Sequence, residues 1–287
     1  MILSVSRRTD IPAFYSEWFF NRVKAGFMDI RNPMNPQQIR RIEINPEVID
    51  CIVFWSKNPE PMLIRLQELA EFNYYFQFTL NPYDSAIEPN VPNKIELLET
   101  FKRLSNIVGS KRVIWRYDPI LIAEGIDIDY HIQQFEFFAK SLYGKTETCV
   151  ISFLDRYRKI EKKLATISAR SLHDDEIFIL AKAFSEIAKA YTISIQTCAE
   201  KYNLQAFGIT KGKCINDSLT ESLFQISVSK QKDKYQRPEC GCVTSVDIGE
   251  YNSCGHGCMY CYANGNQDVV RRKIANHQSN SSFLIDL

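Results

Sequence analysis

Short apolar runs along the N-terminal part of the chain alternate with longer amphipathic stretches. The short runs are rich in β-branched and aromatic residues and end in polar residues, which is typical of strands. Six runs are predicted as strands: residues 2–5, 51–55, 74–78, 112–115, 149–153 and 192–195. The stretches between them place apolar side chains at helical spacing, as in residues 60–72 and 175–191. This alternation predicts an α/β fold with a parallel sheet, arranged as a full or partial TIM-like (βα) barrel.

The pattern changes at about residue 203, where loops, glycines and cysteines replace the alternation. One further helix is expected near residues 217–226, and the polar residues 276–282 are expected to fray. We therefore predict a (βα) barrel domain over residues 1–202 and a C-terminal cysteine-rich extension over residues 203–287, packed over the barrel mouth.

Polar side chains follow the predicted strands, at the end where such barrels carry their functional groups. The expected catalytic residues are Arg8, Asp10, Lys57, Arg116 and Asp118. The expected cofactor-binding residues are Arg7, Gln77, Thr79, Asp155, Gln196 and Glu200. The cations among them suit a carboxylate or phosphate group. The alternative is that these are ordinary loop residues and caps, because loops are polar in any protein.

The charge of the chain is balanced, with 35 Lys and Arg residues against 34 Asp and Glu residues. This balance gives no strong field toward nucleic acid or an acidic membrane. The first residues lack the basic region, long apolar core and cleavage site of a signal peptide. No apolar run approaches the roughly 18 residues of a membrane span. We therefore expect a cytoplasmic protein with no membrane partner.

Nine cysteines are present, and five of them fall within residues 240–261. Clustered thiols without a secretion signal are typical of metal or cluster ligands rather than disulfides. Cys51 and Cys149 differ from the rest, because each begins an apolar strand and is expected to be a small buried hydrophobe.

Cys254, Cys258 and Cys261 have the spacing C-x3-C-x2-C. Three thiolates in a tight loop can hold three irons of a [4Fe-4S] cluster and leave the fourth iron open. The amino acid moiety of S-adenosylmethionine on the open iron would allow one electron to cleave a carbon–sulfur bond and release a deoxyadenosyl radical. The alternative is a structural zinc site completed by His256 or another cysteine, although zinc ribbons prefer separated C-x2-C pairs.

The spacing, with Tyr260 directly before the third cysteine, resembles the signature of the radical S-adenosylmethionine superfamily. Almost the whole chain, from residues 4–12 through 53–59 and 115–119 to 258–264, also resembles the domain-of-unknown-function 1848 family. This resemblance implies a radical-enzyme-like barrel and no particular substrate. Most radical S-adenosylmethionine enzymes carry the motif after the first strand, whereas here it lies near the C-terminus.

Four further cysteines lie in predicted loops: Cys198, Cys214, Cys240 and Cys242. Four loop thiolates are enough for a second, fully ligated [4Fe-4S] cluster or for a tetrahedral zinc, and unliganded thiols are the third possibility.

These features predict a radical S-adenosylmethionine enzyme that acts on a small-molecule or nucleic-acid-derived substrate. Its electron donor would be a flavodoxin or ferredoxin. The competing hypothesis is a non-catalytic binding protein stapled by zinc or a cluster.

Overall fold

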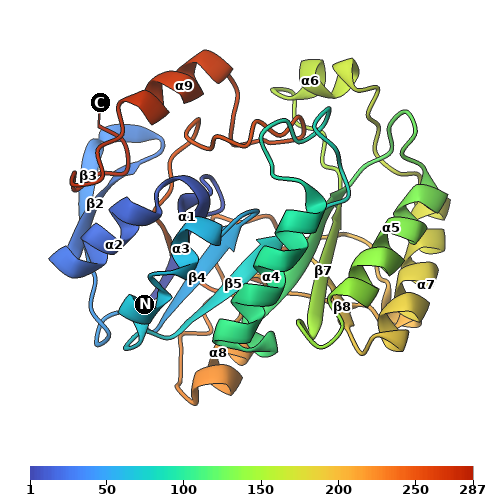
Figure 1. Cartoon of the computed structure of the whole chain (residues 1–287), viewed down its shortest axis with the longest axis horizontal. Helices are drawn as coiled ribbons and strands as arrows, with labels where there is room; N and C mark the ends of the chain where they lie inside the picture. The colour runs from blue at the N-terminus through green and yellow to red at the C-terminus, as the bar shows by residue number, and fades with distance from the viewer. Residues whose placement is uncertain (287) are drawn as a thin grey trace.

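A computed structural model describes residues 1–286 of the chain, with an eight-stranded parallel sheet at its centre (Figure 1). The strands are β1 (Ile2–Val5), β4 (Cys51–Ser56), β5 (Tyr74–Thr79), β6 (Val113–Ile120), β7 (Thr148–Phe153), β8 (Ser194–Thr197), β9 (Thr210–Lys211) and β10 (Val246–Asp247). Their order in the sheet is β10-β1-β4-β5-β6-β7-β8-β9, so the two short strands form its edges. The prediction of an α/β fold with a parallel sheet is confirmed, and each of the six predicted strands overlaps an observed one.

Two strands outside the sheet were not expected. β2 (Phe27–Asn32) and β3 (Asn35–Glu43) form an antiparallel hairpin. Nearly every residue of β3 is exposed, so this strand lacks the apolar alternation from which strands are predicted.

The helices follow the strands along the chain. They are α1 (Ile11–Phe14), α2 (Ser16–Ala25), α3 (Glu60–Leu63), α4 (Lys94–Val108), α5 (Ile128–Ser141), α6 (Glu161–Thr166), α7 (Asp174–Ala190), α8 (Asp217–Phe224) and α9 (Gln267–Ala275). The helix expected over 175–191 is α7, whereas residues 60–72 divide into α3 and a 3-10 helix, Leu66–Leu69. Among residues 1–286, no helix is both long enough and apolar enough to span a membrane.

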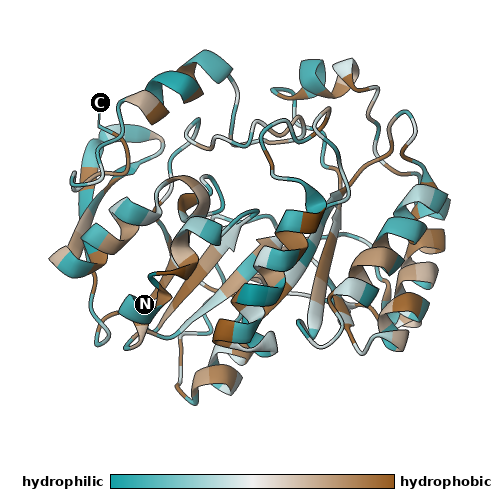
Figure 2. Cartoon of the chain, viewed as in Figure 1, coloured by the Kyte–Doolittle hydropathy of each residue, from teal (hydrophilic) through white to brown (hydrophobic). Residues whose placement is uncertain are grey.

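Both faces of the sheet are buried, because side chains alternate between the faces and each face has its own cover. One face packs against helices, as where Trp115 stacks on Phe135 of α5 with ring centroids 4.9 Å apart. The other face, with Val53 and Tyr75, packs against the segment that contains Cys214 and Cys242. Figure 2 shows apolar residues along the strands and a mixture of apolar and polar residues along the helices.

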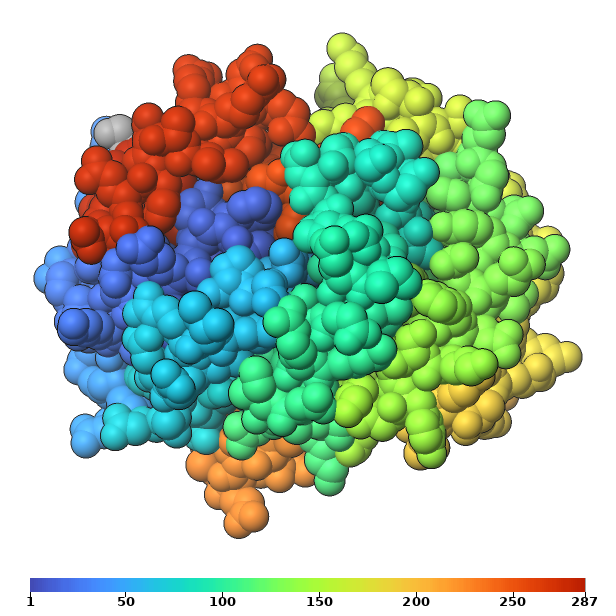
Figure 3. Space-filling view, in the orientation of Figure 1, coloured from blue at the N-terminus to red at the C-terminus, as the bar shows by residue number. Residues whose placement is uncertain are grey.

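The C-terminal residues lie against the N-terminal helices (Figure 3). The Trp18 indole donates a hydrogen bond of 2.9 Å to the Ser281 carbonyl oxygen, and Leu284 and Ile285 are buried. The expectation that residues 276–282 fray is therefore wrong, since α2 supplies donors for their carbonyl groups.

Candidate functional site

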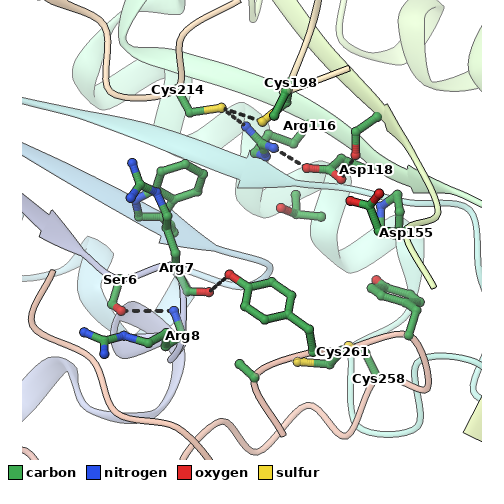
Figure 4. Close-up of a pocket in the computed structure, with 18 of the residues that line it drawn as sticks. Ser6, Arg7, Arg8, Arg116, Asp118, Asp155, Cys198, Cys214, Cys258 and Cys261 are labelled. Atoms are coloured by element: carbon green, nitrogen blue, oxygen red, sulfur yellow. Dashed lines mark hydrogen bonds and ion pairs between the residues drawn. The ribbon is translucent and has the colours of Figure 1, made fainter. Parts of the chain in front are cut away.

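A cavity of about 640 Å³ lies at the carboxyl ends of the strands, and cysteines of both groups line it. Figure 4 shows Cys258 and Cys261 on one side of this cavity, with Cys198 and Cys214 on the opposite side. The predicted residues that also line it are Arg7, Arg8, Asp10, Lys57, Thr79, Arg116, Asp118 and Asp155. The parallel sheet thus brings together side chains that are far apart in the sequence.

The loop that carries Cys254, Cys258 and Cys261 is attached to the rest of the protein through its backbone. The Asn90 side-chain amide donates to the Gly255 carbonyl oxygen at 2.8 Å, and the Met259 amide donates to the Ile87 carbonyl oxygen at 2.9 Å. A Cβ atom at Gly255 would lie 2.7 Å from the Phe14 ring, so glycine is needed for this close approach.

Asp10 and His256 join the first helix to this loop. His256 Nε2 lies 2.7 Å from Asp10 Oδ2, and both side chains are buried. Asp10 Oδ2 also accepts from the Lys57 amide at 2.7 Å, and Oδ1 accepts from the Ser56 hydroxyl at 2.7 Å. Burial opposes the ionised form of Asp10, but the hydrogen bond from His256 helps to lower its pKa. Asp10, predicted as catalytic, lines the cavity and also connects the cysteine loop to the residues after β4.

Glu88 is the buried centre of a charged network that sequence reasoning missed. Its carboxylate accepts from Lys57 Nζ at 2.7 Å and from Lys94 Nζ at 2.6 Å. The Tyr260 hydroxyl donates to the same carboxylate. Burial alone would raise the pKa of Glu88, but the charges of Lys57 and Lys94 outweigh it and lower the pKa to about 2. The aromatic residue of the cysteine motif is therefore held against an ionised carboxylate.

Arg8 is occupied by Asp247, the last residue of β10. The Arg8 Nη2 atom lies 3.0 Å from Asp247 Oδ1. Asp247 also accepts from the Ser6 hydroxyl at 2.5 Å and from the Arg7 amide at 2.9 Å. These contacts hold β10 on β1, so the charge of Arg8 serves the fold.

Arg116 and Asp118 lie at the end of β6, deep in the cavity. Arg116 forms an ion pair with Asp118, which also accepts from the Ser152 hydroxyl. Burial would raise the pKa of Asp118, but the Arg116 charge lowers it. Arg116 Nη1 also donates to Cys214 Sγ at 2.8 Å.

The second group of cysteines is drawn together by loops after β8 and β9 and before β10. Cys198 Sγ lies 3.2 Å from Cys214 Sγ, and the thiol of Cys242 contacts those of Cys214 and Cys240. The Ile215 amide donates to Cys242 Sγ at 3.3 Å. As placed, no three His, Cys, Asp or Glu side chains in residues 1–286 are arranged to hold one metal ion. The four thiols therefore form a string of contacts rather than a closed ligand set.

Residues 2–263 match the model of a domain of unknown function, DUF1848. The chain belongs to this family. Searches of the curated proteins and of the solved structures found no match.

The remaining predicted residues of the DUF1848 chain, Gln77, Gln196 and Glu200, do not line the cavity. Gln77 lies behind it, donating to the Cys214 carbonyl oxygen at 3.0 Å. Gln196 lies in β8 beside Gly212, and Glu200 accepts from the Phe153 amide at 2.9 Å. Burial raises the pKa of Glu200 to about 7. Two of these side chains, Gln77 and Glu200, thus bind backbone groups near the cavity.

The donor set at the C-x3-C-x2-C loop fits a cluster with an open iron better than a zinc ion completed by histidine. His256 is the nearest candidate for a fourth ligand. Its Nε2 atom forms a hydrogen bond with Asp10, and its Nδ1 atom lies 3.4 Å from the Asn90 carbonyl oxygen. Both imidazole nitrogens are thus directed at oxygen atoms of the protein, which leaves three thiols on the cavity wall.

The two isolated cysteines are of a different kind. Cys51 and Cys149 are fully buried in strands, and burial raises the pKa of the Cys51 thiol to about 12. Neither lines the cavity within the described part of the chain.

Proposed function

We propose that this protein is a radical S-adenosylmethionine enzyme in which Cys254, Cys258 and Cys261 hold a [4Fe-4S] cluster. The observation that carries the proposal is the shared cavity. Three thiols of one loop line it without a fourth ligand from His256, and charged side chains of the strand ends line its other walls. When bound, such a cluster supplies an electron that cleaves S-adenosylmethionine to a deoxyadenosyl radical, with an amino acid group on the open iron.

The residues of the chain would position the cofactor and exclude water. Asp118 stays ionised beside Arg116, so its carboxylate can accept hydrogen bonds from ribose hydroxyls or from an ammonium group. Lys57 shares the Glu88 carboxylate with Lys94, so its ammonium group is held beside the Tyr260 ring and its charge is partly balanced. The cavity of about 640 Å³ is within the range of small-molecule sites.

The proposal extends to the surroundings of the site. The parallel sheet would be a partial TIM-like barrel, with residues 203–287 as the extension over its mouth. The substrate would be a small molecule or a nucleic-acid-derived group. A flavodoxin or ferredoxin in the cytoplasm would deliver the electron.

The competing proposal is a non-catalytic binding protein stapled by zinc or a cluster, and the convergence of Cys198 and Cys214 is the observation in its favour. Metal analysis of protein kept free of oxygen separates the two. We expect about four irons and four sulfides lost together in the variant C254A/C258A/C261A. The control is C51A/C149A, which removes the two buried thiols away from the cavity and should keep the iron. Full iron content in the triple variant would place the cluster elsewhere, and a colourless protein containing only zinc would favour the binding protein.

A further inference from the structure

Four cysteines meet on the side of the cavity opposite the C-x3-C-x2-C loop, and the proposed enzyme gives them no role. Cys198 follows β8 and Cys214 follows β9, at one edge of the sheet. Cys240 and Cys242 precede β10, at the other edge. A ligand held by all four would connect the two edges of the sheet through the segment that covers the face with Val53 and Tyr75.

Two guanidinium groups line the same cavity as these thiols, and one of them has a nitrogen atom without a hydrogen-bond partner among residues 1–286. Arg116 Nη1 donates to Cys214 Sγ at 2.8 Å, while its charge is shared with Asp118. Arg7 Nη2 is buried and has no hydrogen-bond partner among residues 1–286. Burial would lower the pKa of Arg7, but acidic groups close to its guanidinium raise it. These groups are the Asp247 carboxylate and the thiols of Cys242, Cys214 and Cys240.

Both cations lie close to the Trp55 ring. Its centroid is 5.4 Å from Arg7 Cζ and 5.1 Å from Arg116 Cζ. A buried guanidinium is costly unless an anion is close to it. Four thiolates around one divalent cation would carry a net charge of −2, which the two neighbouring guanidinium groups would stabilise in addition to their carboxylate neighbours Asp118 and Asp247.

The spacing of the sulfur atoms distinguishes a single ion from a cubane. Thiolates in a tetrahedral zinc site lie about 3.8 Å apart, given a Zn–S distance of about 2.3 Å. In a [4Fe-4S] cluster each thiolate binds a different iron and points away from the others, so the sulfurs are much further apart. The separation of 3.2 Å between Cys198 and Cys214 is close to the first arrangement.

We propose that Cys198, Cys214, Cys240 and Cys242 bind one Zn²⁺ ion as a tetrathiolate, with Arg7 and Arg116 as its neighbouring cations. The string of thiol contacts closes around the ion as the four side chains rotate, and zinc replaces the protons of these thiols. The site is structural, because four protein ligands leave no open position. It holds the segment before β10 in place and so supports the loop that carries Cys254.

Zinc analysis on the variant C254A/C258A/C261A tests this proposal separately from the proposed enzyme. We expect one zinc per chain in this variant and none after further replacement C240S/C242S. A failure of the iron prediction leaves the zinc result unaffected. One zinc per chain in both variants would overturn the site. So would a second set of four irons and sulfides that disappears with Cys240 and Cys242, or a Cys198–Cys214 disulfide detected by mass spectrometry in metal-free protein.

Cobalt substitution keeps the test decisive if C240S/C242S does not fold. Co²⁺ added to zinc-depleted C254A/C258A/C261A should give the thiolate charge-transfer and tetrahedral ligand-field bands of a four-sulfur site. Replacement of Arg7 by Gln in the same background should weaken zinc binding about 10- to 100-fold, whereas Arg7→Lys retains the charge and should lose less. Octahedral cobalt bands, or equal affinity of the Arg7→Gln and parent proteins, would contradict the proposed role of the arginines.

Discussion

The Asp10 carboxylate lies 2.7 Å from His256 Nε2, although 246 positions separate the two residues in the sequence. Asp10 also caps α1 by accepting from the Ala13 amide at 3.1 Å. One buried carboxylate therefore connects the first strand–helix turn to the cysteine loop. The cysteine loop lies far from the first strand in the sequence, and this contact connects the two in space.

Replacing Asp10 by Asn should destabilise the protein and loosen the cysteine loop. The carboxylate accepts four hydrogen bonds, two on each oxygen, so an amide places its NH₂ group against donors. We expect a loss of about 2 kcal/mol in the free energy of unfolding, and lower iron content after reconstitution. Urea denaturation and iron analysis measure both. The control Ser56→Ala removes one of the four donors to Asp10, together with the acceptor of the Asn58 amide, and should cost about 1 kcal/mol. Unchanged stability and iron content in Asp10→Asn would show that this contact does not position the loop.

Replacing Glu88 by Gln should be among the most damaging single substitutions at the cavity. It leaves the buried ammonium groups of Lys57 and Lys94 without their shared carboxylate. Breaking a buried ion pair from one side costs about 3 kcal/mol or more. The control Glu68→Gln breaks the exposed pair with Arg65 and should cost less than about 1 kcal/mol. Equal unfolding midpoints in urea for the two variants would contradict this view of Glu88.

His131 should make the protein less stable as the pH falls. Its Nδ1 atom is 2.8 Å from the Tyr117 hydroxyl and its Nε2 atom is 2.8 Å from the Leu121 carbonyl oxygen, inside the helical core. Burial lowers the pKa of His131 from 6.5 to about 4. Between pH 6.5 and about 4, His131 is therefore protonated in the unfolded chain but neutral in the folded chain.

The destabilisation from His131 between these limits is about 3 kcal/mol. It is absent above pH 6.5 and complete below about 4. Thermal unfolding followed from pH 7.5 to 4.5 should show a shallower pH slope for His131→Gln than for the natural protein. His173→Gln, at an exposed position, is the matched control and should keep the natural slope. Parallel slopes for all three proteins would rule out His131 as the source.

The sequence allowed the strands and the cysteines to be identified, because both leave local patterns. Runs such as residues 51–55 are apolar at every position since both faces of the sheet are covered. Glu88 and Asp247 have no such pattern. Glu88 binds Tyr260, which is 172 positions away, and Asp247 binds Arg8, which is 239 positions away. A local sequence pattern cannot predict contacts between residues so far apart in the chain.

The type of a residue at a strand end did not predict which group it binds. The sequence predicts that Arg8 and Lys57 bind a carboxylate or phosphate group of a ligand, whereas in the structure each pairs with a carboxylate of the protein from a distant segment. Gln196 lies within β8 and Glu200 follows that strand, and neither side chain lines the cavity. The end of a strand can be located from sequence, whereas the partner that neutralises a charge there cannot.

The reductive cleavage of S-adenosylmethionine tests the central claim most directly. Protein prepared without oxygen and reduced with dithionite is incubated with S-adenosylmethionine, and 5′-deoxyadenosine and methionine are measured by chromatography. Each cleavage consumes one electron from the reduced protein, and positioning the sulfonium beside the cluster is enough for slow turnover without the true substrate. We predict 5′-deoxyadenosine from the natural protein and none above background from C254A/C258A/C261A. Equal amounts from both proteins, with the natural protein carrying its full iron content, would contradict the claim.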